Sequence, residues 1–318
     1  MKLGLGLDAG GTQTRWALVQ ADGSLLAEGS IAAISGLQLA QGDARNALAQ
    51  PLQQLAAAVA AATAATAATA VWAASATSAT KPLGLVAGLT GFDAATTALW
   101  CELSAAALGL QASAVKVLSD IELACHAAFE PGQGVVVYAG TGSIAAHLDA
   151  SGELHRCGGR GAVIDDAGGG HWIARQALQH IWRNEDAAPG RWRHSAMARA
   201  VFAQIGGSDW PRCRAWVYGA SRGELGLLAL AVASAAEEDP AALALLQAAG
   251  QELGRLARAL LGRVGPQPVA LAGRVFELHP AVQAALLVNL EPGTQVQRLT
   301  LPPHHAAARL AARLFCCP

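Results

Sequence analysis

The stretch LDAGGTQTRWAL, residues 7–18, joins an apolar strand to a second strand through an acidic residue, two glycines and a threonine. A plain hairpin does not need so many small residues. Glycines after a strand leave backbone N–H groups open to approach, and such amides bind anions. Thr12 and Thr14 add hydroxyl donors, whereas Asp8 can hold a magnesium ion or its waters but repels phosphate. For this turn alone, a tight bulged hairpin is the alternative.

A second stretch, GVVVYAGTGSIAAHLDASGELHRCGG at residues 134–159, repeats this pattern. Each stretch has an apolar strand, a turn opened by Ala-Gly, a second strand, a short glycine turn and a third strand. We therefore predict one supersecondary unit used twice. Two such turns that face one another across a cleft can hold the β- and γ-phosphates of a nucleotide from opposite sides. The sequence contains neither a Walker loop nor a dinucleotide-binding fingerprint.

Strand-like and helix-like runs alternate along the chain, which is typical of an α/β protein. Helices are expected from 37 to about 74 and, in the second half, at about 170–184, 195–205, 222–237 and 240–264, with a later strand at 269–273. We predict an N-terminal domain of residues 1–117 and a C-terminal domain of residues 118–302. The closing helix, within 303–318, is a candidate for packing on the first domain.

The composition argues against several classes of protein. The formal net charge is −1, so there is no basic excess to bind nucleic acid or an anionic membrane. The alanine-rich segment 56–80 lacks Leu, Ile and Phe, which makes it a poor membrane span. The N-terminus lacks the apolar core of a signal peptide. We expect a cytoplasmic protein without nucleic-acid or membrane partners.

The cysteines and histidines do not predict a metal site. The six cysteines show no C-x-x-C spacing and no paired histidines nearby, which favours free thiols. His304 and His305 are adjacent, but no further ligand stands near them in the sequence.

Several stretches, taken in order, resemble the BadF/BadG/BcrA/BcrD ATPase family, within the actin-like superfamily of sugar kinases and chaperone ATPases. The likeness is to its N-acetylglucosamine kinase and glucosamine kinase members and spans nearly the whole chain. It rests on DAGGTQTR (8–15), GLTGFD (88–93), LSDIELA (118–124), AGTGS (139–143), CGGRGAVIDDAGGGHWIA (157–174) and VALAGRV (269–275). It implies two actin-like (ribonuclease H-like) α/β domains with a central cleft.

The resemblance also implies roles for residues. Asp120 matches the general base that accepts the proton of a sugar hydroxyl; its alternative role is to cap the following helix. Asp8 is expected to hold Mg²⁺ through water. The phosphates and nucleoside of ATP are expected at Gly10, Gly11, Thr12, Gly140, Thr141, Gly142, Ser143, Gly273 and Arg274. The sugar is expected at Thr90, Gly91, Gly158, Gly159 and Asp166, with Asp165 as the alternative acid.

Some positions depart from the family pattern. Ile144 stands where these kinases usually carry Asn, and Ala167 where they carry Glu or Gln. The early loop reads AAISGLQLA, without their sugar-binding Asn, and Arg274 replaces a small residue. The triplet GGR at 158–160 is more similar to the glucosamine kinase branch. These departures weaken the prediction of any particular sugar.

The resemblance thus predicts an ATP- and Mg²⁺-dependent kinase that phosphorylates an amino sugar, at its 6-hydroxyl. Two alternatives stay open: a sugar or nucleotide sensor without turnover, and an activator ATPase of 2-hydroxyacyl-CoA dehydratases. The activator needs bridging cysteines, for which Cys125 and Cys157 form no convincing pair. A homodimer also stays open, and the expected partners are the sugar and ATP.

Overall fold

The computed structural model describes residues 2–9, 13–34, 44–69, 81–89 and 94–316. The chain divides into two compact units. Unit 1 comprises Met1–Ala127 and Thr300–Pro318, and unit 2 comprises Ala128–Leu299. The helix α4 (Asp120–Ala128) therefore lies almost wholly in unit 1, as does the closing helix α13 (Pro303–Phe315), whereas the sequence analysis placed residue 120 in the second domain.

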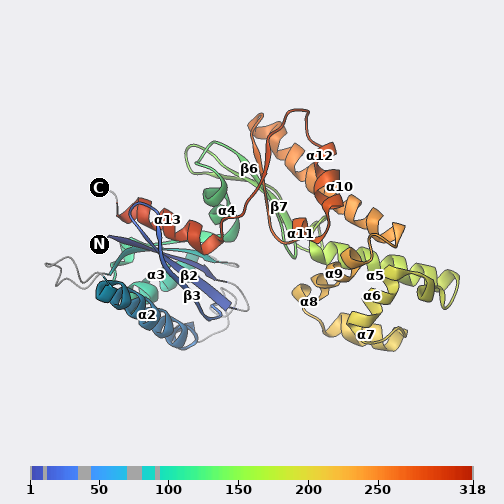
Figure 1. Cartoon of the computed structure of the whole chain (residues 1–318), viewed down its shortest axis with the longest axis horizontal. Coiled ribbons are helices and arrows are strands. Elements are labelled where there is room, and N and C mark those ends of the chain that lie inside the picture. The colour runs from blue at the N-terminus through green and yellow to red at the C-terminus, as the bar shows by residue number, and fades with distance from the viewer. Residues whose placement is uncertain (1, 10–12, 35–43, 70–80, 90–93, 317–318) are drawn as a thin grey trace. The chain divides into compact units, whose positions relative to one another are not determined.

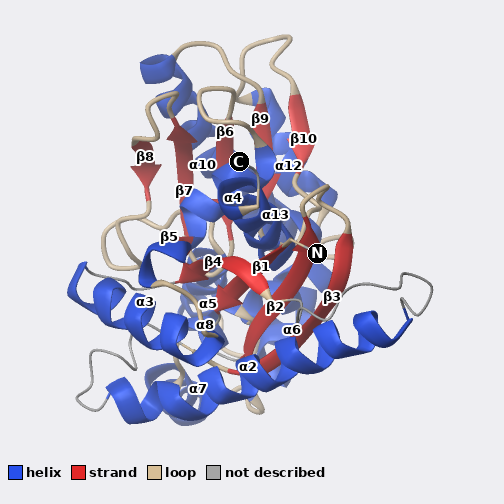
Figure 2. Cartoon of the chain, turned by 90° about the vertical axis from the view of Figure 1, so that its left-hand side faces the viewer, coloured by secondary structure: helices blue, strands red, loops and turns tan. Residues whose placement is uncertain are grey.

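Each unit is built on a five-stranded mixed sheet, and the two sheets have the same topology. Unit 1 has the order β3-β2-β1-β4-β5, and unit 2 the order β8-β7-β6-β9-β10 when read in the same sense (Figures 1 and 2). In each, the first three strands are antiparallel and the last two run parallel to the first. The predicted repeat is confirmed. The strands are β1 Leu3–Ala9, β2 Gln13–Gln20, β3 Leu25–Ala32, β4 Pro82–Leu89, β5 Val115–Ser119, β6 Val135–Ala139, β7 Ser143–Leu148, β8 Leu154–Gly158, β9 Val269–Ala272 and β10 Val296–Arg298.

Strand β1 shows how unit 1 forms its layers. Its sequence LGLGLDA places leucines on one face of the sheet and glycines on the other, because side chains alternate along a strand. The leucine face packs against α2 (Ala44–Thr69) and α3 (Ala94–Leu108). The glycine face packs against α13, and a Cβ on Gly6 would lie 2.1 Å from the backbone nitrogen of Ala308. The helix backbone therefore rests directly on the strand, with α2 and α13 on opposite faces (Figure 1).

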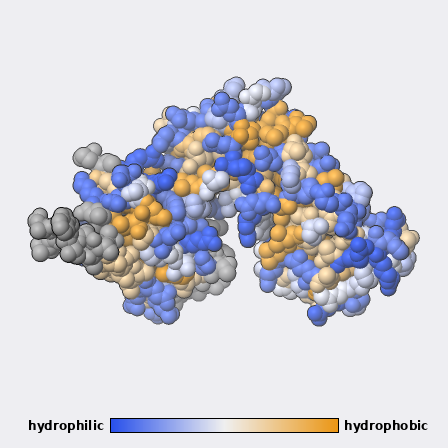
Figure 3. Space-filling view, in the orientation of Figure 1, coloured by the Kyte–Doolittle hydropathy of each residue, from blue (hydrophilic) through white to orange (hydrophobic). Residues whose placement is uncertain are grey.

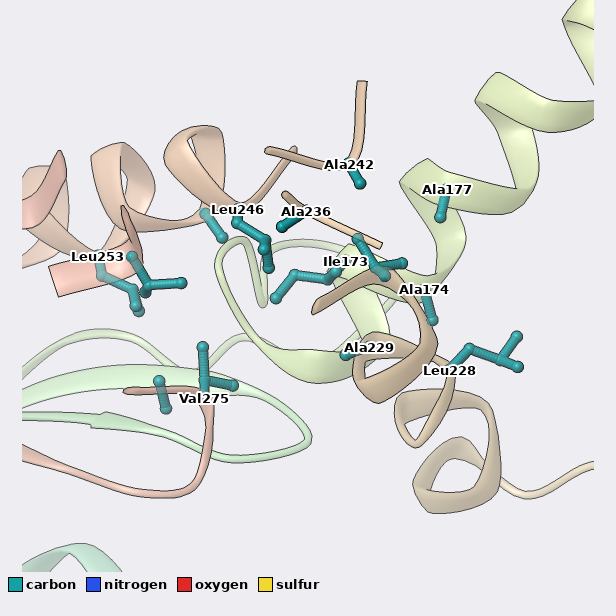
Figure 4. Close-up of a cluster of buried hydrophobic side chains, with 14 of the residues drawn as sticks. Ile173, Ala174, Ala177, Leu228, Ala229, Ala236, Ala242, Leu246, Leu253 and Val275 are labelled. Atoms are coloured by element: carbon teal, nitrogen blue, oxygen red, sulfur yellow. The ribbon is translucent and has the colours of Figure 1, made fainter. Parts of the chain in front are cut away.

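Unit 2 covers its sheet with a larger set of helices. Its core joins Ile173, Leu246 and Leu253 to many alanines, whose short side chains let the helices approach closely (Figure 4). The helices are α5 Gly170–Ala187, α6 Ala196–Ile205, α7 Trp210–Gly219, α8 Arg222–Gly226, α9 Leu228–Ser234, α10 Pro240–Val264, α11 Val275–Leu278 and α12 Pro280–Val288. Short 3-10 helices are η1 Ala112–Ala114 and η2 Arg191–His194.

The structure corrects some expected elements. The run 222–237, expected as one helix, is divided into α8 and α9, and α7 was not predicted at all. The expected helix from 37 to about 74 is described from Ala44 to Thr69. Across the described ranges, no helix combines the length and apolar character needed to cross a bilayer. The surface is a mixture of hydrophilic and hydrophobic residues (Figure 3).

Candidate functional site

The first residues of α5 hydrogen-bond to the turn between β6 and β7. The amide of Gly170 donates to the carbonyl of Gly140 at 2.8 Å, and that of His171 donates to the carbonyl of Thr141 at 3.0 Å. Within the turn, the Gly140 amide donates to the Gly142 carbonyl at 2.9 Å. The carbonyls of Gly140 and Thr141 are thus occupied by α5, and that of Gly142 by the turn itself.

The remaining amides of this turn are available to a ligand. Among the described residues, the amides of Thr141 and Gly142 have no acceptor. Two arginines lie near as well: burial, Arg222 and Arg175 lower the pKa of the His171 side chain, and Asp166 opposes this. Unpaired amides and nearby positive charge are what an anion such as a phosphate requires.

The segment 157–170 wraps around the same turn. The Ser143 hydroxyl donates to the Ala167 carbonyl at 2.6 Å, and the Gly159 amide donates to the Ser143 carbonyl at 2.9 Å. Gly158 and Gly159 have φ values of +75° and +64°, which favour glycine. The predicted sugar-side glycines are therefore brought to the predicted phosphate turn.

Asp166 is buried under the turn and is paired there. Its side chain is 5% exposed, and Oδ2 lies 3.0 Å from a guanidinium nitrogen of Arg222. Oδ1 accepts from the Gly161 amide at 3.2 Å. A Cβ on Gly142 would lie 2.5 Å from Asp166 Oδ2, so a larger residue there would have to displace the paired Asp166 carboxylate. The neighbouring acid Asp165 instead pairs with Arg255 at 3.2 Å.

A pocket of about 280 Å³ opens beside the turn. Among the residues that line it are Gly140, Thr141, Leu227, Leu230, Arg274 and Leu278. Leu227 is 42% exposed and Leu230 is 56% exposed, so the pocket offers apolar surface to a ligand. A pocket with mostly apolar walls and a few polar groups at one end is typical of small-molecule sites.

The segment after β9 forms another wall of this pocket. Gly273 has a φ of +96°, and a Cβ there would lie 2.3 Å from the carbonyl oxygen of Ala139. Glycine therefore lets the chain leave β9 directly against the end of β6. Arg274 follows and is the N-cap of α11. In this way two sequence segments more than a hundred residues apart line one pocket.

In unit 1, Asp120 is the first residue of α4 but does not cap it. The Ser119 hydroxyl accepts from the Glu122 amide at 3.2 Å, and Glu122 Oε2 accepts from the Ser119 amide at 2.9 Å. This is a capping box, which satisfies the helix start without Asp120. The Asp120 carboxylate accepts only from the adjacent Ile121 amide, at 2.9 Å, among the described residues. The alternative capping role of Asp120 is thus filled by Ser119.

Asp8 and Asp120 lie toward the same edge of the unit 1 sheet. Asp8 pairs with Gly88, and Gly88 with Leu118, so all three lie near the carboxyl ends of parallel strands. Burial raises the pKa of Asp8, the Arg15 guanidinium opposes this, and the Asp120 charge adds to it. The pKa of Asp120 is also raised, chiefly because surrounding protein atoms shield its carboxylate from water. The hydrogen bond from the Ile121 amide lowers this pKa, and the Glu122 charge raises it. Neighbouring carboxylates whose charges repel suit a divalent cation.

Some residues of the predicted site lie outside the part of the chain that the structure describes, and other residues of the site were not predicted. Gly10, Gly11, Thr12, Thr90 and Gly91 lie outside the described residues. Arg222, Leu227 and Leu230 were missed by the sequence analysis. One signal was present: Ser221 and Glu224 form a capping box, which marks the start of α8 at Arg222.

Proteins similar to this chain are found by sequence and by structure. A sequence model of the BadF/BadG/BcrA/BcrD ATPase family matches residues 5–308. A candidate N-acetylglucosamine kinase from Chromobacterium violaceum is 29% identical, with a TM-score of 0.67, over 96% of this chain and 98% of that chain.

Two further solved structures share the fold at lower identity. A candidate N-acetylglucosamine kinase from Porphyromonas gingivalis is 15% identical, with a TM-score of 0.66 over 97% of this chain and 98% of that one. A ROK family glucokinase from Streptomyces griseus, solved with glucose and AMPPNP, is 16% identical, with a TM-score of 0.57 over 99% of each chain. The predicted fold class, with actin-like α/β units, is confirmed.

Proposed function

Because this chain belongs to the BadF/BadG/BcrA/BcrD ATPase family, whose fold it shares with sugar kinases, we propose that it transfers the γ-phosphoryl group of ATP to an amino sugar. The acceptor is a hydroxyl, the 6-hydroxyl of N-acetylglucosamine or glucosamine. The choice of an amino sugar as acceptor is based on the family resemblance and on the kinases to which the chain is similar.

The observation that carries this proposal is the pocket of unit 2. It joins the Gly140–Thr141 turn to the Gly273–Arg274 segment and to two exposed leucines. The unpaired amides of Thr141 and Gly142 suit phosphate oxygens, and the leucines suit a flat apolar base. Such a pocket accommodates a nucleoside whose phosphates extend to the glycine turn. We assign ATP to it.

Asp120 is the proposed general base. Its helix is capped by Ser119, so the carboxylate can accept the proton of an attacking hydroxyl. In phosphoryl transfer, alignment and charge neutralisation supply most of the rate, and the base need only lie within hydrogen-bond reach. ATP bound with Mg²⁺ supplies the transferred group. Asp8 is the proposed residue for holding the magnesium ion through water.

The proposed sugar side comprises Gly158, Gly159 and Asp166, with Thr90 and Gly91. Asp166 is fixed by Arg222 and the Gly161 amide, so any hydrogen bond to a sugar comes from a rigid carboxylate. Ala167 offers only its carbonyl, which already accepts from Ser143. The loss of a Glu or Gln there removes a polar partner, which favours a smaller or less substituted amino sugar.

The experiment is a measurement of ATP consumption with a panel of amino sugars, hexoses and anhydro-sugars, using the wild type and Asp120→Asn. We expect turnover with an amino sugar. The variant should lose roughly 10²–10⁴-fold in kcat, because general-base catalysis contributes about that much, and should keep its ATP affinity. Asp186→Asn, an exposed acid on α5, is the matched control.

The outcomes separate the possible functions. Near-normal turnover by Asp120→Asn would remove that residue from the reaction. If calorimetry detects sugar and ATP binding by the wild type but no sugar is phosphorylated, the kinase proposal fails and the sensor alternative is supported.

A further inference from the structure

Glu28, His304 and His305 meet on unit 1, although 276 residues separate the first from the second. Glu28 Oε2 lies 3.3 Å from His304 Nε2 and 2.6 Å from His305 Nε2. The two imidazole rings are 4.5 Å apart and are nearly perpendicular, at 74°. Both rings thus present the same nitrogen to one carboxylate oxygen, which the adjacent histidines alone did not indicate.

The elements that carry these side chains are held in place. Glu28 lies in the edge strand β3, where it pairs with Ala17 of β2. His304 lies in the first turn of α13, where that helix rests on β1: a Cβ on Gly6 would come 2.3 Å from the His304 carbonyl oxygen. The cluster is therefore supported by regular elements, which hold ligands more precisely than loops do.

We propose that Glu28, His304 and His305 bind a divalent transition metal ion, with Zn²⁺ as the favoured ion. Two imidazole nitrogens and one carboxylate oxygen are a known zinc ligand set, which leaves a fourth position for water. The three ligand atoms lie within 4.8 Å of one another. Ligands of a tetrahedral zinc ion are separated by about 3.3 Å, as zinc–ligand bonds of about 2.0–2.1 Å require.

The local geometry needs little change to hold the ion. The 3.3 Å separation already fits, and the 2.6 Å separation must lengthen. The Glu28 side chain is 51% exposed, so it is free to move outward. A bound ion would tie the closing helix to the edge of the sheet and would stabilise unit 1.

The environment of His304 supports this proposal. The residue is 6% exposed, and its Nδ1 has no partner among the described residues, so Nε2 provides its polar contact, with Glu28. The Arg15 guanidinium acts on the His304 side chain and opposes a bound cation, so it reduces the affinity.

The test is a zinc titration of the full chain, kept reduced, with a competing chromophoric chelator. The variants are Glu28→Gln, which keeps an acceptor for the histidines but loses the charge, and His305→Gln. Each should lose at least about 10–100-fold in zinc affinity, because even the loss of an outer-shell partner costs that much. His279→Asn is the matched control, since His279 also pairs with a carboxylate, that of Glu237, at 2.9 Å, and Asn can replace it as the N-cap of α12.

Two further measurements identify the ligands. Zinc should raise the Tm of the wild type and of His279→Asn, but not of Glu28→Gln, since binding to the native state stabilises it. Co²⁺ in place of zinc should give visible bands without a thiolate charge-transfer band, which excludes the cysteines. No saturable zinc binding by the wild type, or unchanged affinity in both Glu28→Gln and His305→Gln, would overturn the proposal.

Discussion

Arg222 holds the buried carboxylate of Asp166 against the glycine turn: their charged atoms are 3.0 Å apart, and Gly142 lies against both. The arginine is about half exposed, whereas the aspartate is almost inaccessible. The pair joins α8, the sugar-side segment and the phosphate turn. This contact links the proposed sugar and nucleotide sites within unit 2.

Removal of Arg222 should destabilise unit 2. In Arg222→Ala the Asp166 carboxylate stays buried with the Gly161 amide but loses its charge partner, which costs roughly 1–3 kcal/mol in the free energy of unfolding. Urea unfolding followed by tryptophan fluorescence measures this. Arg255→Ala is the control, because the Arg255–Asp165 pair is exposed and should contribute about 1 kcal/mol or less. Equal losses in the two variants would contradict the burial argument.

The acidic limb of the pH–rate profile should respond to Glu122. Because the pKa of Asp120 is raised, its proton-accepting form is lost as the pH falls through a value above the ordinary aspartate range. Glu122→Gln removes a charge that contributes to this rise and keeps the capping box, since Gln also serves there. The acidic limb of kcat/KM should therefore move to lower pH. An unmoved limb would mean that the limb reports another group.

Gly273→Ala should impair ATP binding more than its backbone strain alone explains. Gly273 and Gly293 have φ values of +96° and +90°, so alanine at either position costs about 1–3 kcal/mol. A Cβ at Gly273 would collide with the backbone carbonyl of Ala139, beside the phosphate turn, whereas a Cβ at Gly293 would meet no atom within 4 Å. The KM for ATP should rise in Gly273→Ala and stay unchanged in Gly293→Ala. A similar rise in both would point to general destabilisation instead.

Leu230→Glu should weaken ATP binding without affecting the chemical step. The side chain lines the pocket and is half exposed, so a charge there is tolerated by the fold but opposes an apolar base. We expect the KM for ATP to rise roughly tenfold, equivalent to about 1.4 kcal/mol, with kcat retained. Val288→Glu, at an 86% exposed position of α12, is the control. An unchanged KM in Leu230→Glu would place the nucleotide elsewhere.

Much of the fold was predictable because its signals are local. The alternation of Leu and Gly in β1 and the Ala-Gly turns of both repeats indicated the strands and the duplication, which the sheet topology confirms. The weaker predictions lay in helices of unit 2. The run 227–233 is entirely apolar, so periodicity alone did not show the break at Leu227 between α8 and α9.

By itself, the sequence determined the α/β class and the repeated strand unit, because turn chemistry and strand periodicity depend on neighbouring residues; Asp120 and the glycine turns were predicted as site residues with the help of the family resemblance. Only the tertiary structure decided which distant side chains meet: Arg222 with Asp166, Leu230 with Arg274 around one pocket, and Glu28 with His304 and His305. Such meetings depend on how strands and helices pack, and no local pattern in the chain encodes a distance between residues far apart along it.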